Sequence, residues 1–170
     1  VKPSRVPRIV KESILGNKVI KDLLYKEPGN GKTYKSHEEI PFYKNQVRVS
    51  MRNLGKIDPE DMEDALAHGA YGGLVKALDG MSPDDVLTTV EESGLRGRGG
   101  GGFATGRKWR SCKRASGDRK FVVCNGDEGD PGAFKDRAIM EGDPHSVLEG
   151  MALGAYAIGS SEGYIYVRDE

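Results

Sequence analysis

Cysteine and histidine are scarce in this sequence, and long apolar runs are missing. Of its 170 residues only two are cysteine, Cys112 and Cys124, and three are histidine. An iron–sulfur cluster or a structural zinc ion needs more ligands, so we expect no metal site in this chain. No apolar run approaches the ~20 residues of a membrane-spanning helix, and the first residues lack the apolar region of a signal peptide. We therefore expect a cytoplasmic protein that does not insert into a membrane.

The sequence also lacks a net charge. Its 26 lysine and arginine residues balance its 26 aspartate and glutamate residues. No overall field draws the chain toward nucleic acid or a membrane surface, so any electrostatic function must be local. The length allows a single domain with its own core. Because the sequence has no initiator methionine and stops directly after a strand-like run at 164–167, we expect it to be a fragment.

Local signals predict an α/β fold. A capping residue followed by proline marks three helix starts: Asp58-Pro59, Ser82-Pro83 and Asp143-Pro144. The helices predicted from these starts span about 59–68 (continuing to 78), 83–92 and 144–158. Two short β-branched runs, 121–124 and 164–167, flank the third helix. Strand, crossover helix and strand form the βαβ unit of a parallel, Rossmann-like sheet with flanking helices.

The beginning of the chain differs from the rest. It is charged and irregular, with a cluster of turn-forming residues at 27–32, and the alternating stretch 46–51 predicts a peripheral strand. We expect residues 1–57 to be an irregular N-terminal extension and residues 58–170 to form the domain.

One short segment is unusually rich in glycine. Six of the ten residues from 97 to 106 are glycine, and we expect that they do not serve packing. Such a loop is favoured where the main chain adopts positive φ angles or touches a ligand. Its amides, a helix start near Thr105, and the side chains of Arg98, Arg107 and Lys108 predict an anion site, most simply for a phosphate.

The glycine segment does not match two well-known phosphate loops. Gly97, Gly99 and Gly102 have the G-x-G-x-x-G spacing, but the Rossmann fingerprint follows a strand and this one follows a helix. The Gly-Lys-Ser/Thr of a P-loop is missing as well. Two alternatives stay open: a flexible linker, and a single-stranded RNA-binding segment that uses the arginines. Those arginines are Arg96, Arg98, Arg107, Arg110 and Arg114.

Polar residues follow the first predicted strand directly. Asn125, Asp127, Glu128 and Asp130 stand where an open parallel sheet binds ligands, outside the carboxyl ends of its strands. Their amide and carboxylate groups suit a ribityl chain, a ribose or a carboxamide. A surface turn and a magnesium or calcium site are the alternatives.

Taken together, these segments resemble a known family. The resemblance lies in 94–103 with Lys108-Trp109, in 124–128, in 134–137 and in 141–145. These segments are similar to the flavin-binding subunit of respiratory complex I and to the β subunits of soluble NAD(P)-linked hydrogenases and formate dehydrogenases. The strong part covers about 80–170, while 41–78 resembles the hydrogenase-type members.

The resemblance implies that residues 58–170 are an incomplete FMN-binding domain that uses FMN and NAD(P)H. The residues that would hold the phosphate side of FMN are Gly97, Arg98, Gly99, Gly100 and Lys108. Those that would bind its ribityl chain and ring are Asn125, Asp127 and Glu128. Phe103 would stack on the nicotinamide nucleotide near Asp130, where the family often has glutamate. No residue is expected to act as an acid, base or nucleophile, because the flavin carries the chemistry.

The same resemblance implies partners. Electrons would pass to iron–sulfur clusters, including a 4Fe-4S cluster beyond residue 170, a thioredoxin-like 2Fe-2S subunit, and a hydrogenase, formate dehydrogenase or complex I type subunit. Flavin-based bifurcation with ferredoxin is the alternative of the same class. A Gly/Arg-rich nucleic-acid-binding module is the alternative of another class.

Overall fold

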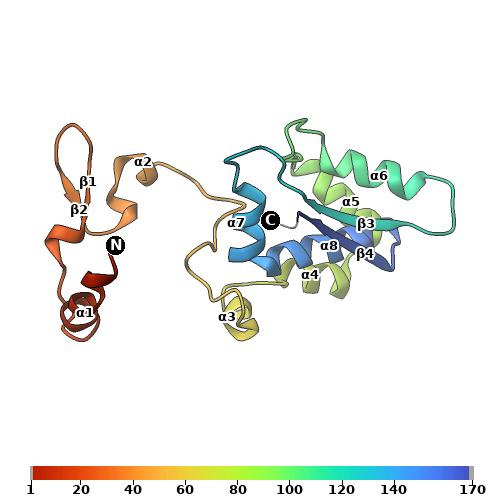
Figure 1. Cartoon of the computed structure of the whole chain (residues 1–170). Coiled ribbons are helices and arrows are strands. Elements are labelled where there is room, and N and C mark those ends of the chain that lie inside the picture. The colour runs from red at the N-terminus through yellow and green to blue at the C-terminus, as the bar shows by residue number, and fades with distance from the viewer. Residues whose placement is uncertain (1, 169–170) are drawn as a thin grey trace. The chain divides into compact units, whose positions relative to one another are not determined.

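The computed structural model describes residues 2–168 and divides the chain into two compact units, residues 1–48 and 49–170. The first unit consists of short elements connected by turns (Figure 1). In chain order these are η1 (Pro3–Arg5), α1 (Val6–Ile9), the π-helical turn η2 (Val10–Ile14), η3 (Lys21–Leu23), β1 (Tyr25–Lys26), β2 (Thr33–Tyr34), η4 (His37–Glu39) and α2 (Pro41–Lys44).

The predicted turn at 27–32 joins the two strands of the first unit. β1 and β2 pair antiparallel, with Tyr25 opposite Tyr34. The Glu27 main-chain N–H donates to the Lys32 carbonyl at 2.8 Å, and Asn30 Nδ2 donates to the Glu27 carboxylate at 2.7 Å. Side-chain and main-chain bonds therefore close this hairpin together.

The second unit holds the longer elements. They are α3 (Met62–Ala67), α4 (Gly72–Gly80), α5 (Pro83–Glu92), α6 (Thr105–Arg114), β3 (Phe121–Gly126), α7 (Lys135–Gly142), α8 (Pro144–Ile158) and β4 (Glu162–Val167). β3 and β4 are parallel, from Phe121 opposite Glu162 to Gly126 opposite Val167, and α8 is the crossover between them. The α/β fold with a parallel βαβ unit is confirmed.

Helix α8 is the central element of this unit. It contacts both strands and also α4, α5, α6 and α7. The buried core lies between α4, α5 and α8 and contains Ala77, Val86, Leu87 and Ala157. Trp109 of α6 packs against this core at Gly154, where a Cβ atom would lie 3.1 Å from the indole ring. A glycine in α8 thus makes room for the only tryptophan of the chain.

Two of the three predicted helix starts are correct. Ser82 caps α5 in a reciprocal capping box with Asp85, and the Asp143 side chain accepts from the Ser146 amide at the start of α8. The start at Asp58 is wrong: α3 begins at Met62 with Asp61 as its cap. The Asp58 amide instead donates to the Asp64 carboxylate at 2.7 Å, so Asp58 belongs to the turn before the helix.

The strand predicted at 46–51 is also wrong, since these residues form bends and turns. They cross the division between the two units, which lies after Arg48, whereas the sequence predicted a boundary after residue 57. Residues 49–57 group with the second unit because buried Asn53 donates to buried Asp143 at 2.8 Å.

One glycine of the glycine-rich segment has a packing role that the sequence interpretation excluded. Gly106 of α6 is buried, and a Cβ atom on it would lie 2.5 Å from Glu91 Cγ and 2.7 Å from the Glu91 main-chain nitrogen. Helices α5 and α6 can therefore approach closely only because residue 106 has no side chain.

Candidate functional site

The glycine loop is closed at its base by main-chain contacts. Arg96 and Ala104 form an isolated antiparallel bridge, and the Gly97 N–H donates to the Phe103 carbonyl at 2.9 Å. The Thr105 N–H donates to the Leu95 carbonyl, also at 2.9 Å. The loop thus leaves α5, turns back on itself and enters α6 with a defined base.

Beyond this base the main-chain N–H groups have no partners. Within residues 2–168, the amides of residues 98–102 make no hydrogen bond. Gly100 and Gly102 have φ angles of +102° and +56°, which L side chains rarely adopt. A run of exposed amides with left-handed glycines is the arrangement that binds anions in main-chain concavities. These residues fit the phosphate end of a mononucleotide.

Two basic side chains accompany these amides. Arg98 lies in the loop and Lys108 in the first turn of α6, and both are exposed. Neither makes a hydrogen bond or ion pair within the described residues. Phe103 is 60% exposed at the end of the loop. These groups are therefore accessible to a ligand.

The polar segment after β3 is folded by its own side chains. Asn125 Oδ1 accepts from the Asp127 amide at 3.0 Å, and Asp127 Oδ1 accepts from Arg168 Nε at 2.9 Å. The Asp130 carbonyl accepts from the Ala133 amide at 3.0 Å, which closes a turn. The structure thus combines both interpretations of this segment, a tight turn and a set of polar groups at the end of a strand.

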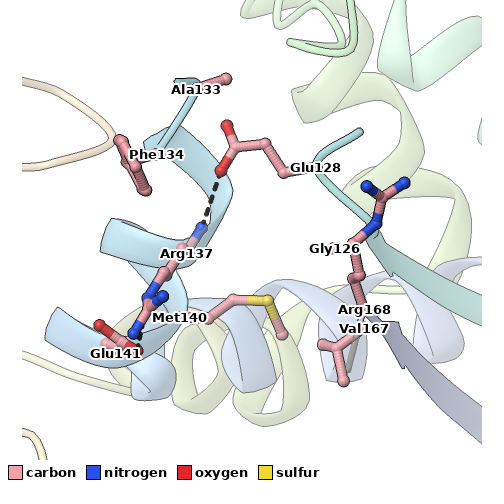
Figure 2. Close-up of a pocket in the computed structure, with 9 residues that line it drawn as sticks. All are labelled: Gly126, Glu128, Ala133, Phe134, Arg137, Met140, Glu141, Val167 and Arg168. Carbon is pink, nitrogen blue, oxygen red and sulfur yellow. Dashed lines mark hydrogen bonds and ion pairs between the residues drawn. The ribbon is translucent and has the colours of Figure 1, made fainter. Parts of the chain in front are cut away.

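Glu128 is bound to the start of α7. Its carboxylate accepts from the main-chain amides of Lys135, Asp136 and Arg137 at 2.7, 3.0 and 3.3 Å. Figure 2 shows the bond from the Arg137 amide. Burial alone would raise the pKa of Glu128, but these amides outweigh it and hold the pKa below its usual value. The carboxylate is therefore ionised and acts as a cap for α7.

Neither α7 nor this cap was predicted from the sequence. The capping residue lies seven positions before the helix rather than next to it, with the Pro131-Gly132 turn between them. The one available signal was a carboxylate followed by a turn and then by Lys135–Gly142, a segment with helix-forming residues.

A cavity of about 270 Å³ opens between α7 and the carboxyl ends of the two strands. Its lining includes Gly126, Glu128, Phe134, Met140, Val167 and Arg168, all of which are labelled in Figure 2. Of the predicted cofactor-binding residues, Glu128 alone lines it. The absence of a side chain at Gly126 lets Met140 pack against the end of β3, because a Cβ atom there would lie 2.5 Å from Met140 Sδ.

The glycine loop and the polar segment lie toward one end of the second unit. The connection 115–120 joins the end of α6 to the start of β3, and in Figure 1 these two elements run in opposite directions. The start of α6 and the carboxyl end of β3 are therefore on the same side. No hydrogen bond or ion pair links 97–108 to 125–130 within the part of the chain that the structure describes.

A known protein family matches the part of the chain that contains the glycine loop and the polar segment. Residues 90–170, which contain both segments, match the family described as the Nuo51 FMN-binding domain. These residues are similar to that family over both candidate segments. The resemblance to flavin subunits of complex I and of NAD(P)-linked hydrogenases is thereby confirmed.

Curated relatives extend the similarity toward the N-terminus. The chain is 54% identical over 127 residues to the NADP-reducing hydrogenase subunit HndC of Solidesulfovibrio fructosivorans, covering 75% of this chain and 26% of that protein. It is 49% identical over 122 residues to an NADH-quinone oxidoreductase subunit of Rhizobium meliloti (strain 1021), covering 72% and 29%. The chain thus spans under a third of the length of these relatives.

A solved structure is similar over almost the whole chain. An NAD+-reducing [NiFe]-hydrogenase in the air-oxidized state shares 27% sequence identity with a TM-score of 0.54, covering 99% of this chain and 26% of that chain.

Two features of the described residues 2–168 bear on other functions. None of their helices has the length and apolar character needed to cross a bilayer. No group of three or more histidine, cysteine, aspartate or glutamate side chains among them is placed to hold a metal ion.

Proposed function

We propose that this chain is part of a flavoprotein subunit that passes a hydride between NAD(P)H and FMN. The observation that carries the proposal is that the loop of unpaired amides at 98–102 lies inside the segment that matches an FMN-binding family. A flexible linker would have no closed base, and nucleic-acid binding finds no support in the comparisons.

In this proposal the glycine loop binds the phosphate of FMN. The amides of residues 98–102 donate to its oxygens, while Arg98 and Lys108 neutralise its charge. The base formed by Gly97 and Phe103 holds the amides in position before the ligand arrives. Little ordering of the loop is then needed on binding.

The polar segment after β3 would contact the rest of the cofactor. Asn125 Nδ2 and the second oxygen of Asp127 make no hydrogen bond within the described residues and can bind ribityl hydroxyls. Glu128, proposed from the resemblance to bind the flavin, has both oxygens engaged by α7. We assign it instead to positioning the turn that contains Asp130.

FMN, when bound, supplies the hydride acceptor or donor and can release electrons one at a time. The protein's residues hold and orient the two rings. Phe103, exposed next to the loop, would stack on the nicotinamide nucleotide near Asp130, so that the reacting atoms lie at contact distance.

The electrons must pass from the flavin to a further acceptor. We propose transfer to iron–sulfur clusters in the rest of the protein and in partner subunits, because relatives are named as subunits of hydrogenases and quinone oxidoreductases. Those names include both NADP-reducing and NADH-linked proteins. Bifurcation with ferredoxin is the second candidate of this class, and a cytoplasmic location is part of the same prediction.

Flavin content tests the proposal. The full-length protein should be yellow and release FMN on denaturation. Gly100→Ala should lower the FMN content, because alanine disfavours the φ of +102° and distorts the amide run. Gly117→Ala is the matched control, since Gly117 also has a positive φ (+130°) and open space around it but lies in the α6–β3 connection. A colourless protein, or equal FMN loss in both variants, would overturn the assignment of the loop.

A further inference from the structure

Helix α6 carries an unusual concentration of positive charge. Five of its ten residues are basic and none is acidic, although the chain as a whole is neutral. The basic residues are Arg107, Lys108, Arg110, Lys113 and Arg114.

Two of these charges are neutralised by α5. Arg110 forms a two-pronged ion pair with Glu91, with Nε–Oε1 at 2.8 Å and Nη2–Oε2 at 2.6 Å. Lys113 Nζ lies 2.8 Å from an Asp84 oxygen. These ion pairs hold α6 against α5, and they occupy most of the hydrogen-bonding capacity of Arg110 and Lys113.

The other arginines are not neutralised in this way. Arg107 and Arg114 are exposed and make no hydrogen bond or ion pair within residues 2–168. With Ser111 between them they stand at positions i, i+4 and i+7, so they share one face of α6. An open groove of about 510 Å³ runs along this face, lined by Glu91, Arg107, Arg110, Ser111, Arg114 and Ala115.

Glu91 is the only carboxylate in the lining of this groove. The hydrogen bonds from Arg110 are the main reason that its pKa lies below the usual value, and burial opposes them. The charges of Arg110, Arg114 and Arg107 act in the same direction. One carboxylate therefore faces three guanidinium groups, and the groove keeps an excess of positive charge.

We propose that the groove between α5 and α6 is a docking surface for an acidic face of a partner protein. Arg107 and Arg114 stand two turns apart, about 10.5 Å along the helix axis, a spacing that matches carboxylates at positions i and i+7 on one face of another helix. Arginine is enriched at protein interfaces, and such charge complementarity speeds association. A small phosphate fits less well, because the amides in the middle of α6 are used within the helix and cannot enclose it. This inference rests on the outer face of α6 and is independent of FMN binding.

A charge reversal at Arg114 in the full-length protein tests the proposal. The probe is a decaglutamate peptide titrated at low salt, with inorganic pyrophosphate as the small-anion comparison. Wild type should bind the peptide, and Arg114→Glu should lower the affinity for the peptide about tenfold. Lys18→Glu, an exposed lysine of the first unit, makes the same charge change and should leave the affinity within about twofold. Raising the ionic strength to about 0.3 M should weaken binding to wild type further.

Two additional measurements keep the test clear. Arg114→Gln, which removes charge without adding a carboxylate to the last turn of α6, should show an intermediate loss. FMN content should not change in either Arg114 variant, so a failure of docking is distinguished from a failure of the flavin assignment. The proposal is overturned if the peptide does not bind wild type, or if Lys18→Glu lowers the peptide affinity as much as Arg114→Glu does. It is also overturned if pyrophosphate binds wild type as tightly as the peptide and Arg114→Glu abolishes that binding.

Discussion

Asn53 Nδ2 donates a hydrogen bond to Asp143 Oδ2 at 2.8 Å, and both side chains are buried. The same carboxylate accepts from the Ser146 amide at 3.1 Å and from the Ser146 hydroxyl at 2.5 Å. One aspartate therefore caps α8 and fastens the segment 49–57 to its start. This bond therefore connects a segment outside the matched residues 90–170 to α8, the crossover helix between β3 and β4.

Removing this carboxylate should loosen the start of α8. Asp143→Ala leaves the Asn53 amide and the Ser146 amide unpaired in a buried place, which should cost about 2–4 kcal/mol of local stability. Hydrogen exchange in the full-length protein should then be faster in 144–148. Asn53→Ala removes one bond and should cost about 1–2 kcal/mol. Unchanged exchange in both variants would show that the Asn53–Asp143 hydrogen bond does not stabilise the start of α8.

The same group predicts a pH dependence. Burial would raise the pKa of Asp143, but the bonds from Ser146 and Asn53 outweigh it and lower the pKa. A depressed pKa means that the stabilisation is complete above the unfolded value of about 4 and is lost as the pH falls through the folded value. Protection of the amides at the start of α8 from exchange, relative to the intrinsic rate at each pH, should therefore fall below about pH 4 in wild type and fall less in Asp143→Asn. Parallel curves for the two proteins would contradict this.

Glu128 should act through α7. Glu128→Ala should accelerate exchange of the 135–137 amides and weaken FMN binding, whereas Glu128→Gln, which keeps one acceptor oxygen, should have a smaller effect. Glu141→Gln is the control, because it breaks only the exposed ion pair with Arg137 on the same helix. If Glu128→Ala changes FMN binding while exchange in α7 is unaltered, Glu128 touches the cofactor directly.

Close contact between α5 and α6 should depend on Gly106. Gly106→Ala places a methyl group 2.5 Å from Glu91 Cγ and 2.8 Å from its Cα atom, so the helices must separate at a cost of about 1–3 kcal/mol. Alanine's better helix propensity, about 1 kcal/mol, offsets only part of this. Gly150→Ala in α8 is the control: open space surrounds that position, so the thermal midpoint should rise slightly there and fall for Gly106→Ala.

Phe103 should affect the nicotinamide nucleotide more than FMN. Phe103→Ala should raise KM for NAD(P)H by about three- to tenfold because a stacking contact is lost, with FMN content unchanged. The base of the loop uses the main-chain carbonyl of residue 103, so it survives the change. Phe42→Ala, an exposed phenylalanine of the first unit, should leave KM unaltered. Loss of FMN with an unchanged KM would move Phe103 to the flavin side of the site.

Local chemistry made part of this protein predictable from its sequence. The caps at Ser82 and Asp143 each act on amides within three residues, so α5 and α8 could be located without knowledge of the fold. The β-branched runs around α8 indicated the parallel strand pair. The density of glycine indicated a loop of accessible amides, because the need for positive φ angles is a property of the residue itself.

Tertiary structure alone decided what depends on distant partners. Gly106 is required because Glu91 of another helix lies against it, and Glu128 caps a helix that begins seven residues later. The choice of Asp61 over Asp58 as the cap of α3 follows from the carboxylate of Asp64, which binds the Asp58 amide. The sequence around each of these residues does not identify its partner, because the partner is set by how the chain folds back on itself in space.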